Sequence, residues 1–424
     1  MSCGPTSGSA PRAPPKGLLP TLADEGFRIF FPLAAIYAAL FPALWVIAWG
    51  VDLPLARTVP PSLWHAHEML IGAFGAALIG FITTAAPEWT DTEPPRGRAL
   101  WALAALWAVG RGVGLLGWDG AGAIGALVDL AWMAALLVWL LWLSWQRKTD
   151  RLIAFAFWLA LLIGCTAAGR FGFLIGDIDL ATLGIHLAGF AFLGLLGLAL
   201  ARITVPVTNL VLDPTERTSP FRPHPGRLHL APGLTLVAMA GEIAGVSPAV
   251  SGYLLIAAGA AFMDRVAEGF IGREALRAEI IMLAGSSAFA GAGLILAGAA
   301  RLGAPWPQVT GLHIAFMGGL GLGVYAVFSI AGLLHTNRPL GLARVVKVGA
   351  LALVGSTVLR IAPDFGLTAP AHGLASVLWA TAFLTWLATY WPALSKVDQE
   401  AEPTLEARQK TNGQTAGDWK EAAE

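Results

Sequence analysis

The chain has 424 residues, of which 56% are hydrophobic and only 13% are charged, and its 27 basic residues balance its 27 acidic ones. A soluble protein carries about 25% charged residues. This composition therefore excludes an ordinary soluble protein and predicts a polytopic membrane protein, and the zero net charge indicates no nucleic-acid partner. Cys3 lies in a polar tail and Cys165 in an apolar run, so we expect neither a disulfide nor a cysteine metal site.

Twelve apolar runs are long enough to cross a bilayer as helices, which takes about 20 residues each. In chain order they are 27–49, 63–86, 99–117, 121–145, 151–175, 181–202, 229–247, 250–268, 278–300, 309–334, 343–361 and 371–394. We therefore predict an all-α membrane domain over residues 27–394. Disordered cytoplasmic tails are expected at 1–26 and 395–424.

The basic residues predict the orientation of these helices, because cytoplasmic connections carry an excess of lysine and arginine. If the N-terminus is cytoplasmic, all lysines and arginines fall on the inner side except Arg57, Arg111, Arg170, Arg301 and Arg360. Both termini are therefore expected in the cytoplasm.

Five of the eight histidines fall in the outer half of this predicted bundle. They are His65, His67, His186, His313 and His372. Ionisable groups in a membrane are costly and usually functional, although a single histidine is as often a hydrogen-bonded packing residue. Imidazole suits haem iron and copper, so five together predict a metal, haem or proton site.

Three of these histidines precede glycine-rich apolar stretches. His67, His186 and His313 open such stretches in the second, sixth and tenth runs, four runs apart. This spacing favours a pseudo-threefold repeat of four helices. Close helix packing at small residues would explain the same pattern without a repeat.

Arg111, Arg170 and Arg360 lie near the outer ends of the third, fifth and eleventh runs. They could extend to lipid headgroups, or pair with anionic groups such as haem propionates beside the histidines. Asp177 and Asp179 are equally available partners, so both interpretations stay open. At the inner end of the sixth run, Pro206 is expected to end or distort the helix.

The stretch PSLWHAHEML places His65 and His67 about 200° apart on a helix, so both cannot point at one centre once the helix has begun. His65 and Glu68, three residues apart, share a face. We expect His67 to face the bundle interior as a ligand. His65 would then serve a second metal or be oriented by Glu68.

The sequence resembles the NnrS family in GFRIFFPLAAIYAAL, WHAHEMLIGAFGAALIGF, HLAGFAFLGLLGLALARITVPVTN, GLHIAFMGGLGLG, LLHTNRPL and ATYWPAL, which span about 27–394. The resemblance implies a twelve-helix bacterial inner-membrane protein that binds haem, of the b type, and copper. It also implies a role in nitric oxide metabolism, denitrification or nitrosative stress. Besides the histidines it highlights Arg28, Trp64, Glu68, Arg202, Thr208, Asn209, His335 and Arg338.

Two departures from the family pattern bear on the ligand set. Many relatives carry a histidine in the ninth helix, where this chain has EIIMLAGSSAFAGAG, and VPVTNLVL at the end of the sixth run is less aromatic than usual. A weaker similarity to the architecture of haem–copper oxidases lacks their helix-six His-Pro-Glu element.

Two functions follow from these patterns. The first is a haem- and copper-binding membrane protein that handles or senses nitric oxide; binding and redox turnover of the gas need the same ligands, so no residue is assigned as catalytic. The alternative is a twelve-helix secondary transporter that uses its histidines for proton or metal-ion traffic. Lipid and a small gaseous ligand are the expected partners, and the sequence indicates no particular electron donor.

Overall fold

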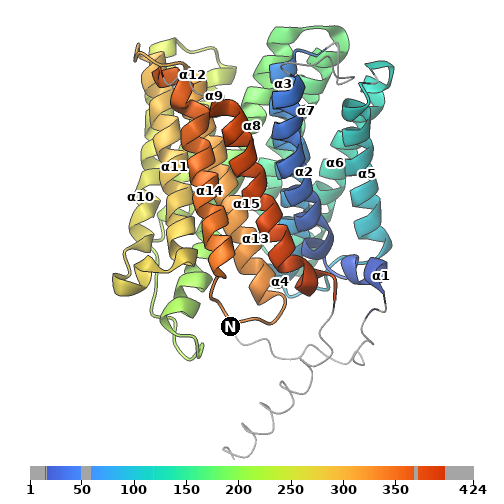
Figure 1. The fold of residues 1–424 in the computed structure, drawn as a ribbon, viewed down its shortest axis with the longest axis vertical. Helices are drawn as coiled ribbons and strands as arrows, with labels where there is room; N and C mark the ends of the chain where they lie inside the picture. The colour runs from blue at the N-terminus through green and yellow to red at the C-terminus, as the bar shows by residue number, and fades with distance from the viewer. Residues whose placement is uncertain (1–14, 16, 49–58, 118, 367–370, 397–424) are drawn as a thin grey trace, which may run out of the picture.

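The computed structural model describes residues 15, 17–48, 59–117, 119–366 and 371–396, and the regular secondary structure of this part is helical, with no strand. The first half contains α1 (Leu18–Leu22), α2 (Gly26–Ala48), α3 (Pro61–His67), the π-helix η1 (Glu68–Phe74), α4 (Gly75–Thr90), α5 (Arg98–Leu115), α6 (Gly122–Arg147), α7 (Ile153–Ile175) and α8 (Ile178–Leu212). The second half contains α9 (Arg227–Ile243), α10 (Pro248–Val266), α11 (Ala278–Arg301), α12 (Gln308–His313), the π-helix η5 (Ile314–Gly321), α13 (Leu322–Leu334), α14 (Arg344–Ile361) and α15 (Ala371–Leu394). Short 3₁₀ turns are η2 (Asp119–Ala121), η3 (Ala267–Gly269), η4 (Gly272–Leu276) and η6 (Ala362–Phe365). The long helices run side by side as one bundle (Figure 1).

The helices form where the apolar runs predict them. In the described residues, ten helical segments are long and apolar enough to cross a membrane, which indicates a membrane protein. Each predicted run overlaps a helix, but α5 and α9 do not meet that length and composition. A helix satisfies its own backbone hydrogen bonds, which a bilayer core cannot do.

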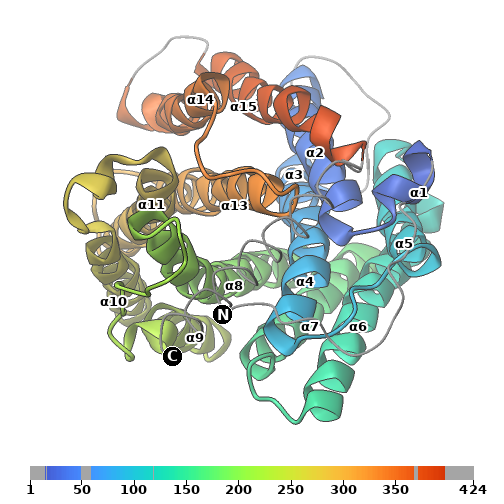
Figure 2. The ribbon, with the colours of Figure 1, turned by 90° about the horizontal axis from the view of Figure 1, so that it is seen from below.

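Three helical segments occupy the centre of the bundle. They are α3–η1–α4, α8 and α12–η5–α13, and Figure 2 shows α4, α8 and α13 around the middle. Their most apolar stretches are 83%, 83% and 72% buried, against 39–56% for the other candidate spans. These are the second, sixth and tenth predicted runs, each with a histidine near its start. The threefold repeat itself stays a prediction.

Two element ends differ from the predicted runs. Pro206 does not end its helix, since α8 continues through it to Leu212; membrane helices tolerate a proline where neighbouring groups compensate for the missing N–H. The predicted disordered tail at 1–26 contains the short helix α1, whose Thr21 hydroxyl donates to the Gly17 carbonyl at 2.9 Å. The rest of both tails lies mostly outside the described residues.

Glycine allows α7 and α8 to approach very closely. A Cβ added at Gly184 would lie 2.3 Å from the Gly169 nitrogen and 2.8 Å from the Cys165 carbonyl oxygen. Both are backbone atoms, so the two helices would have to separate. Small residues at helix crossings permit this kind of packing in membranes.

We therefore expect Gly184→Ala to lower stability by about 1–3 kcal/mol through overpacking. Thermal unfolding in detergent measures the change. Gly164→Ala on α7 is the matched control, because nothing lies within 4 Å of its added Cβ. Equal melting of the two variants would show that the α7–α8 contact is looser than described.

Candidate functional site

A cavity of about 340 Å³ lies at the end of the bundle where α3 and α12 begin, which we call the histidine end. Four of the five predicted histidines line it: His65 on α3, His186 on α8, His313 on α12 and His372 on α15. Its volume is within the range of small-molecule sites, about 300–1,000 Å³. Three central helical segments and one peripheral helix thus bring together residues that are 307 positions apart in the chain, from 65 to 372. We call this space the histidine cavity.

The imidazoles leave ring nitrogens open to a ligand. His186 Nε2 and His65 Nδ1 are buried and have no hydrogen-bond partner in the described residues. His313 Nδ1 lies 2.8 Å from the Val309 carbonyl oxygen. If it donates there, the tautomer leaves Nε2 unprotonated, as in a metal-ligating histidine.

Aromatic contacts orient two of these rings. His65 stacks on Trp45 with ring centroids 5.1 Å apart, and His186 meets Phe190 edge-on at 5.1 Å. Such contacts hold a ring in a fixed direction without using its nitrogens. The orientation therefore persists while the nitrogens stay available.

Arg360 supplies the positive charge in the histidine cavity. It lines the cavity from α14, is half-buried, and forms no hydrogen bond or ion pair with the described residues. Most of the remaining lining is apolar, including Leu312, Phe316 and Trp379. The cavity therefore offers imidazole nitrogens, one guanidinium and an apolar wall.

The described residues contain no group of three or more His, Cys, Asp or Glu side chains close enough to hold one metal ion. Four histidines line one cavity, but no three of them are placed to hold one metal ion.

Beside the histidine cavity, a second group of polar residues is buried among α2, α3, η1, α5, α6 and α7. We call it the ion cluster; its members are Tyr37, His67, Glu68, Arg111, Asp129 and Arg170. Asp129 is 0% exposed and receives two hydrogen bonds from Arg111 Nη2, at 2.8 and 2.9 Å, and another from Arg170 Nε at 3.0 Å. The two carboxylates of the ion cluster, on Glu68 and Asp129, balance the charges of its two guanidinium groups. Buried charges are tolerated when they are paired in this way.

Glu68 connects His67 to the rest of the ion cluster. It lies 3.0 Å from His67 Nδ1 and 3.1 Å from Arg111 Nε, and it accepts a hydrogen bond from the Tyr37 hydroxyl. The other His67 nitrogen is 3.5 Å from Asp129. His67 therefore lies between two carboxylates.

Glycine and the π-helix make room for the ion cluster. A Cβ at Gly110 would lie 2.7 Å from Asp129 Oδ1, and one at Gly72 would lie 2.5 Å from the Tyr37 ring. The Gly72 carbonyl in η1 accepts a hydrogen bond from Trp107 Nε1 at 2.9 Å. Both π-helices, η1 and η5, begin one residue after a predicted site histidine, His67 and His313, and π-helical turns often occur at functional sites.

The structure corrects the predicted roles in PSLWHAHEML. His65 and His67 do diverge, as the 200° spacing predicts. However, His65 lines the histidine cavity, whereas His67 contacts Glu68. The alternative in which Glu68 orients His65 is therefore wrong. His67, which we expected to be the ligand, does not line the histidine cavity.

Arg111 and Arg170 pair with an anionic group beside a histidine, as the second sequence interpretation expects, but the group is the Asp129 carboxylate, which was not among the expected partners. Neither arginine lines the histidine cavity. Asp177, proposed as a partner, instead caps α8 by accepting from the Leu180 N–H at 2.9 Å. Of the three arginines, Arg360 alone lines the cavity.

Sequence reasoning missed Asp129 and Tyr37. A signal was present, because Asp129 is the one charged residue between 121 and 145. An isolated acid in a membrane helix predicts a buried basic partner. Arg111 and Arg170, on flanking runs, were the available candidates.

Most of the other motif positions lie at the end of the bundle opposite the histidines. Arg202 and Asn209 line a cavity of about 530 Å³ there, together with His335. Asn209 holds the following loop, since its amide nitrogen donates to the Phe221 carbonyl at 3.2 Å and its oxygen accepts from the Phe221 N–H at 2.7 Å. His335 stacks on Phe27 at 5.1 Å.

The remaining motif positions line neither of these two cavities. Arg28 donates to the carbonyls of Ala393, Leu394 and Lys396, which ties the start of α2 to the end of α15. Trp64 packs edge-on against Phe41 at 4.6 Å. Thr208 is buried and Arg338 is exposed.

A family model described as NnrS protein matches residues 21–397. The chain belongs to the NnrS family. No curated protein and no solved structure matches it. Membership of the NnrS family suggests a membrane protein of the nitric oxide response.

Proposed function

We propose that this NnrS protein binds haem in the histidine cavity and uses it to bind nitric oxide. The observation that carries the proposal is the buried His186 Nε2, which has no hydrogen-bond partner in the described residues and belongs to a cavity shared with three further histidines. A buried nitrogen without a partner is costly, and coordination to iron would remove that cost. Bound haem would supply an iron site for a small gaseous ligand.

Different residues of the histidine cavity would contact different parts of the haem. His186 and His313 are the first candidates to hold the haem iron, and His65 and His372 are alternatives that line the same cavity. Arg360 is the cation available to a haem propionate, because a guanidinium matches a carboxylate with two hydrogen bonds. The apolar lining suits a porphyrin face.

Copper fits the described residues less well. No three of their His, Cys, Asp or Glu side chains are placed so that they could hold one metal ion, and this chain lacks the ninth-helix histidine of many relatives. We therefore assign copper no ligands. The ion cluster is proposed as a structural and orienting element beside the cavity, with His67 held between Glu68 and Asp129.

The setting proposed for this chemistry is the bacterial inner membrane. All twelve predicted runs would cross it, including those that contain α5 and α9. Both termini would then lie in the cytoplasm and the histidine end outside. A reporter fused after α5 and one fused after α9 would test the two additional crossings. Each is compared with a reporter fused before the same helix. If the two reporters of a pair lie on the same side of the membrane, that helix does not cross it.

Haem titration of the purified protein tests the role of Arg360. We expect Arg360→Ala to weaken haem binding about ten- to hundredfold, since a hydrogen bond to a charged group contributes about 1.5–3 kcal/mol and each 1.4 kcal/mol is tenfold. Arg360→Lys should lose less haem affinity than Arg360→Ala, because lysine keeps the positive charge but cannot form the two paired hydrogen bonds of a guanidinium.

Arg344→Ala, exposed at the opposite end of α14, is the control for the titration. It should bind haem as the wild type does. Equal affinity of all three variants would remove Arg360 from the site.

A further inference from the structure

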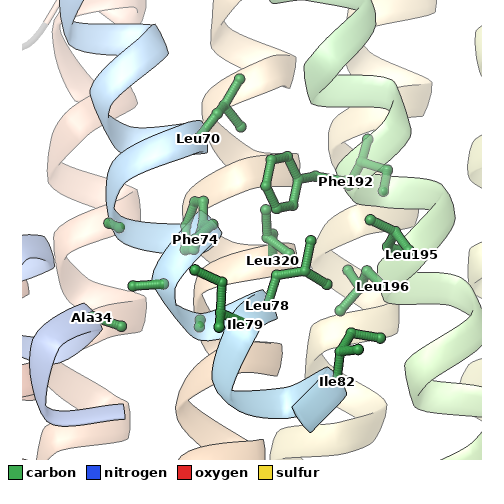
Figure 3. Close-up of a cluster of buried hydrophobic side chains, with 14 of the residues drawn as sticks. Ala34, Leu70, Phe74, Leu78, Ile79, Ile82, Phe192, Leu195, Leu196 and Leu320 are labelled. Atoms are coloured by element: carbon green, nitrogen blue, oxygen red, sulfur yellow. The ribbon is translucent and has the colours of Figure 1, made fainter. Parts of the chain in front are cut away.

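A third cavity, of about 60 Å³, lies between the histidine cavity and the cavity at the opposite end of the bundle. We call it the middle cavity. It is bounded by the three central helical segments, and Figure 3 shows Phe74 and Leu78 facing Phe192, Leu195 and Leu196 across this region. Every residue that lines it is Ala, Gly, Val, Leu or Phe.

The middle cavity shares lining residues with each of the other two cavities. Phe74 lines both the histidine cavity and the middle cavity. Phe81 and Val327 line both the middle cavity and the opposite one. Phe74 and Phe81 are seven residues apart on one helical segment, a rise of about 10 Å, so the middle cavity lies between these two levels of the bundle.

The lining determines what can enter the middle cavity. A buried water needs two to four polar partners, and apolar cavities stay dry and take xenon or small apolar molecules. A charged group would have to leave water without any compensating partner. Water, protons and ions are therefore excluded, whereas a diatomic gas is not.

We propose that the middle cavity is a binding site for small uncharged molecules of the size of a diatomic gas, and that it forms a passage between the histidine cavity and the opposite end of the bundle. Phe74 lies where it meets the histidine cavity, and Phe81 and Val327 lie where it meets the opposite one. The passage stands on the cavity geometry and needs no haem. Combined with the proposed function, it gives nitric oxide a route to the histidine cavity through the protein.

Xenon-pressurised crystals of the full-length protein, prepared without haem, test the binding site. We expect anomalous density for xenon within the volume bounded by Phe74, Leu195 and Leu320. Ala199 lines the middle cavity, so Ala199→Phe should remove that peak by filling the space. Ala160→Phe, a lipid-facing change on α7, should leave it.

Xenon at lipid-facing positions with none in the middle cavity would overturn the proposal. A peak of unchanged height in Ala199→Phe crystals would also contradict it. Because these crystals contain no haem, a negative result here leaves the haem proposal standing, and absence of haem binding leaves this one standing.

Carbon monoxide photolysis of the haem-loaded protein then tests passage. Ala199→Phe should lower the fraction of photolysed carbon monoxide that escapes, relative to Ala160→Phe. Equal escape from both variants, with xenon bound in the wild type, would reduce the middle cavity to a closed binding site and contradict the passage.

Discussion

Asp129→Asn is expected to be the most destabilising single substitution in the ion cluster. Asp129 is fully buried and accepts hydrogen bonds from both Arg111 and Arg170. The amide keeps the shape and removes the charge, so one buried guanidinium charge loses its counter-charge. Breaking a buried ion pair in this way costs about 3–5 kcal/mol. Thermal unfolding in detergent and yield in the membrane fraction measure the loss.

Asp264→Asn is the control for this prediction. Asp264 pairs with Arg227 at 2.7 Å, but its side chain is 42% exposed. An exposed pair contributes about 0–1 kcal/mol, so this variant should unfold nearly as the wild type does.

A double variant separates lost charge balance from a damaged fold. Asp129→Asn with Arg170→Gln removes one charge of each sign and leaves Arg111 beside Glu68 at 3.1 Å. We expect it to recover part of the stability lost in Asp129→Asn. If Asp129→Asn alone unfolds at the same temperature as the wild type, the ion cluster does not hold these helices together.

His186→Ala is expected to remove or strongly change the haem spectrum. Its Nε2 is a buried nitrogen of the histidine cavity without a hydrogen-bond partner in the described residues, and loss of an iron ligand changes the spin state and the Soret band. His313→Ala should have the second-largest effect, since its Nδ1 contact with Val309 orients the ring. Visible spectra at equal protein concentration measure both.

Imidazole added to His186→Ala should restore part of the spectrum by replacing the lost ring. His224→Ala, in the exposed loop at the opposite end, is the control and should leave the spectrum unchanged. Wild-type spectra in all four variants His65→Ala, His186→Ala, His313→Ala and His372→Ala would exclude these residues as ligands.

The positions of the helices could be predicted from the sequence because each apolar run is long enough to satisfy its own backbone in a bilayer. The grouping of His65, His186, His313 and His372 also followed, since helix direction alone places them at one end of the bundle. The overlap of each run with a helix confirms the placement; α5 and α9 show that run length and composition alone leave the crossing number open.

The direction of each side chain could not be predicted with the same rules. His65 and His67 differ by two positions, and only the packing of α3 against its neighbours determines which one meets the cavity. Asp129, an isolated acid in an apolar run, signals a basic partner, but the sequence alone does not show that Arg111 and Arg170 both reach it. The π-helices depend on the bundle that surrounds them and have no signal in the sequence beyond their glycines.

The haem content of the purified wild-type protein tests the central claim most directly. The full-length chain would be expressed with haem supplied, purified in mild detergent, and measured for its visible spectrum and its haem-to-protein ratio. The account predicts a Soret band, a stable haem complex and a spectral change on addition of nitric oxide. A protein that unfolds cooperatively, and is therefore folded, but carries no haem under these conditions would contradict it.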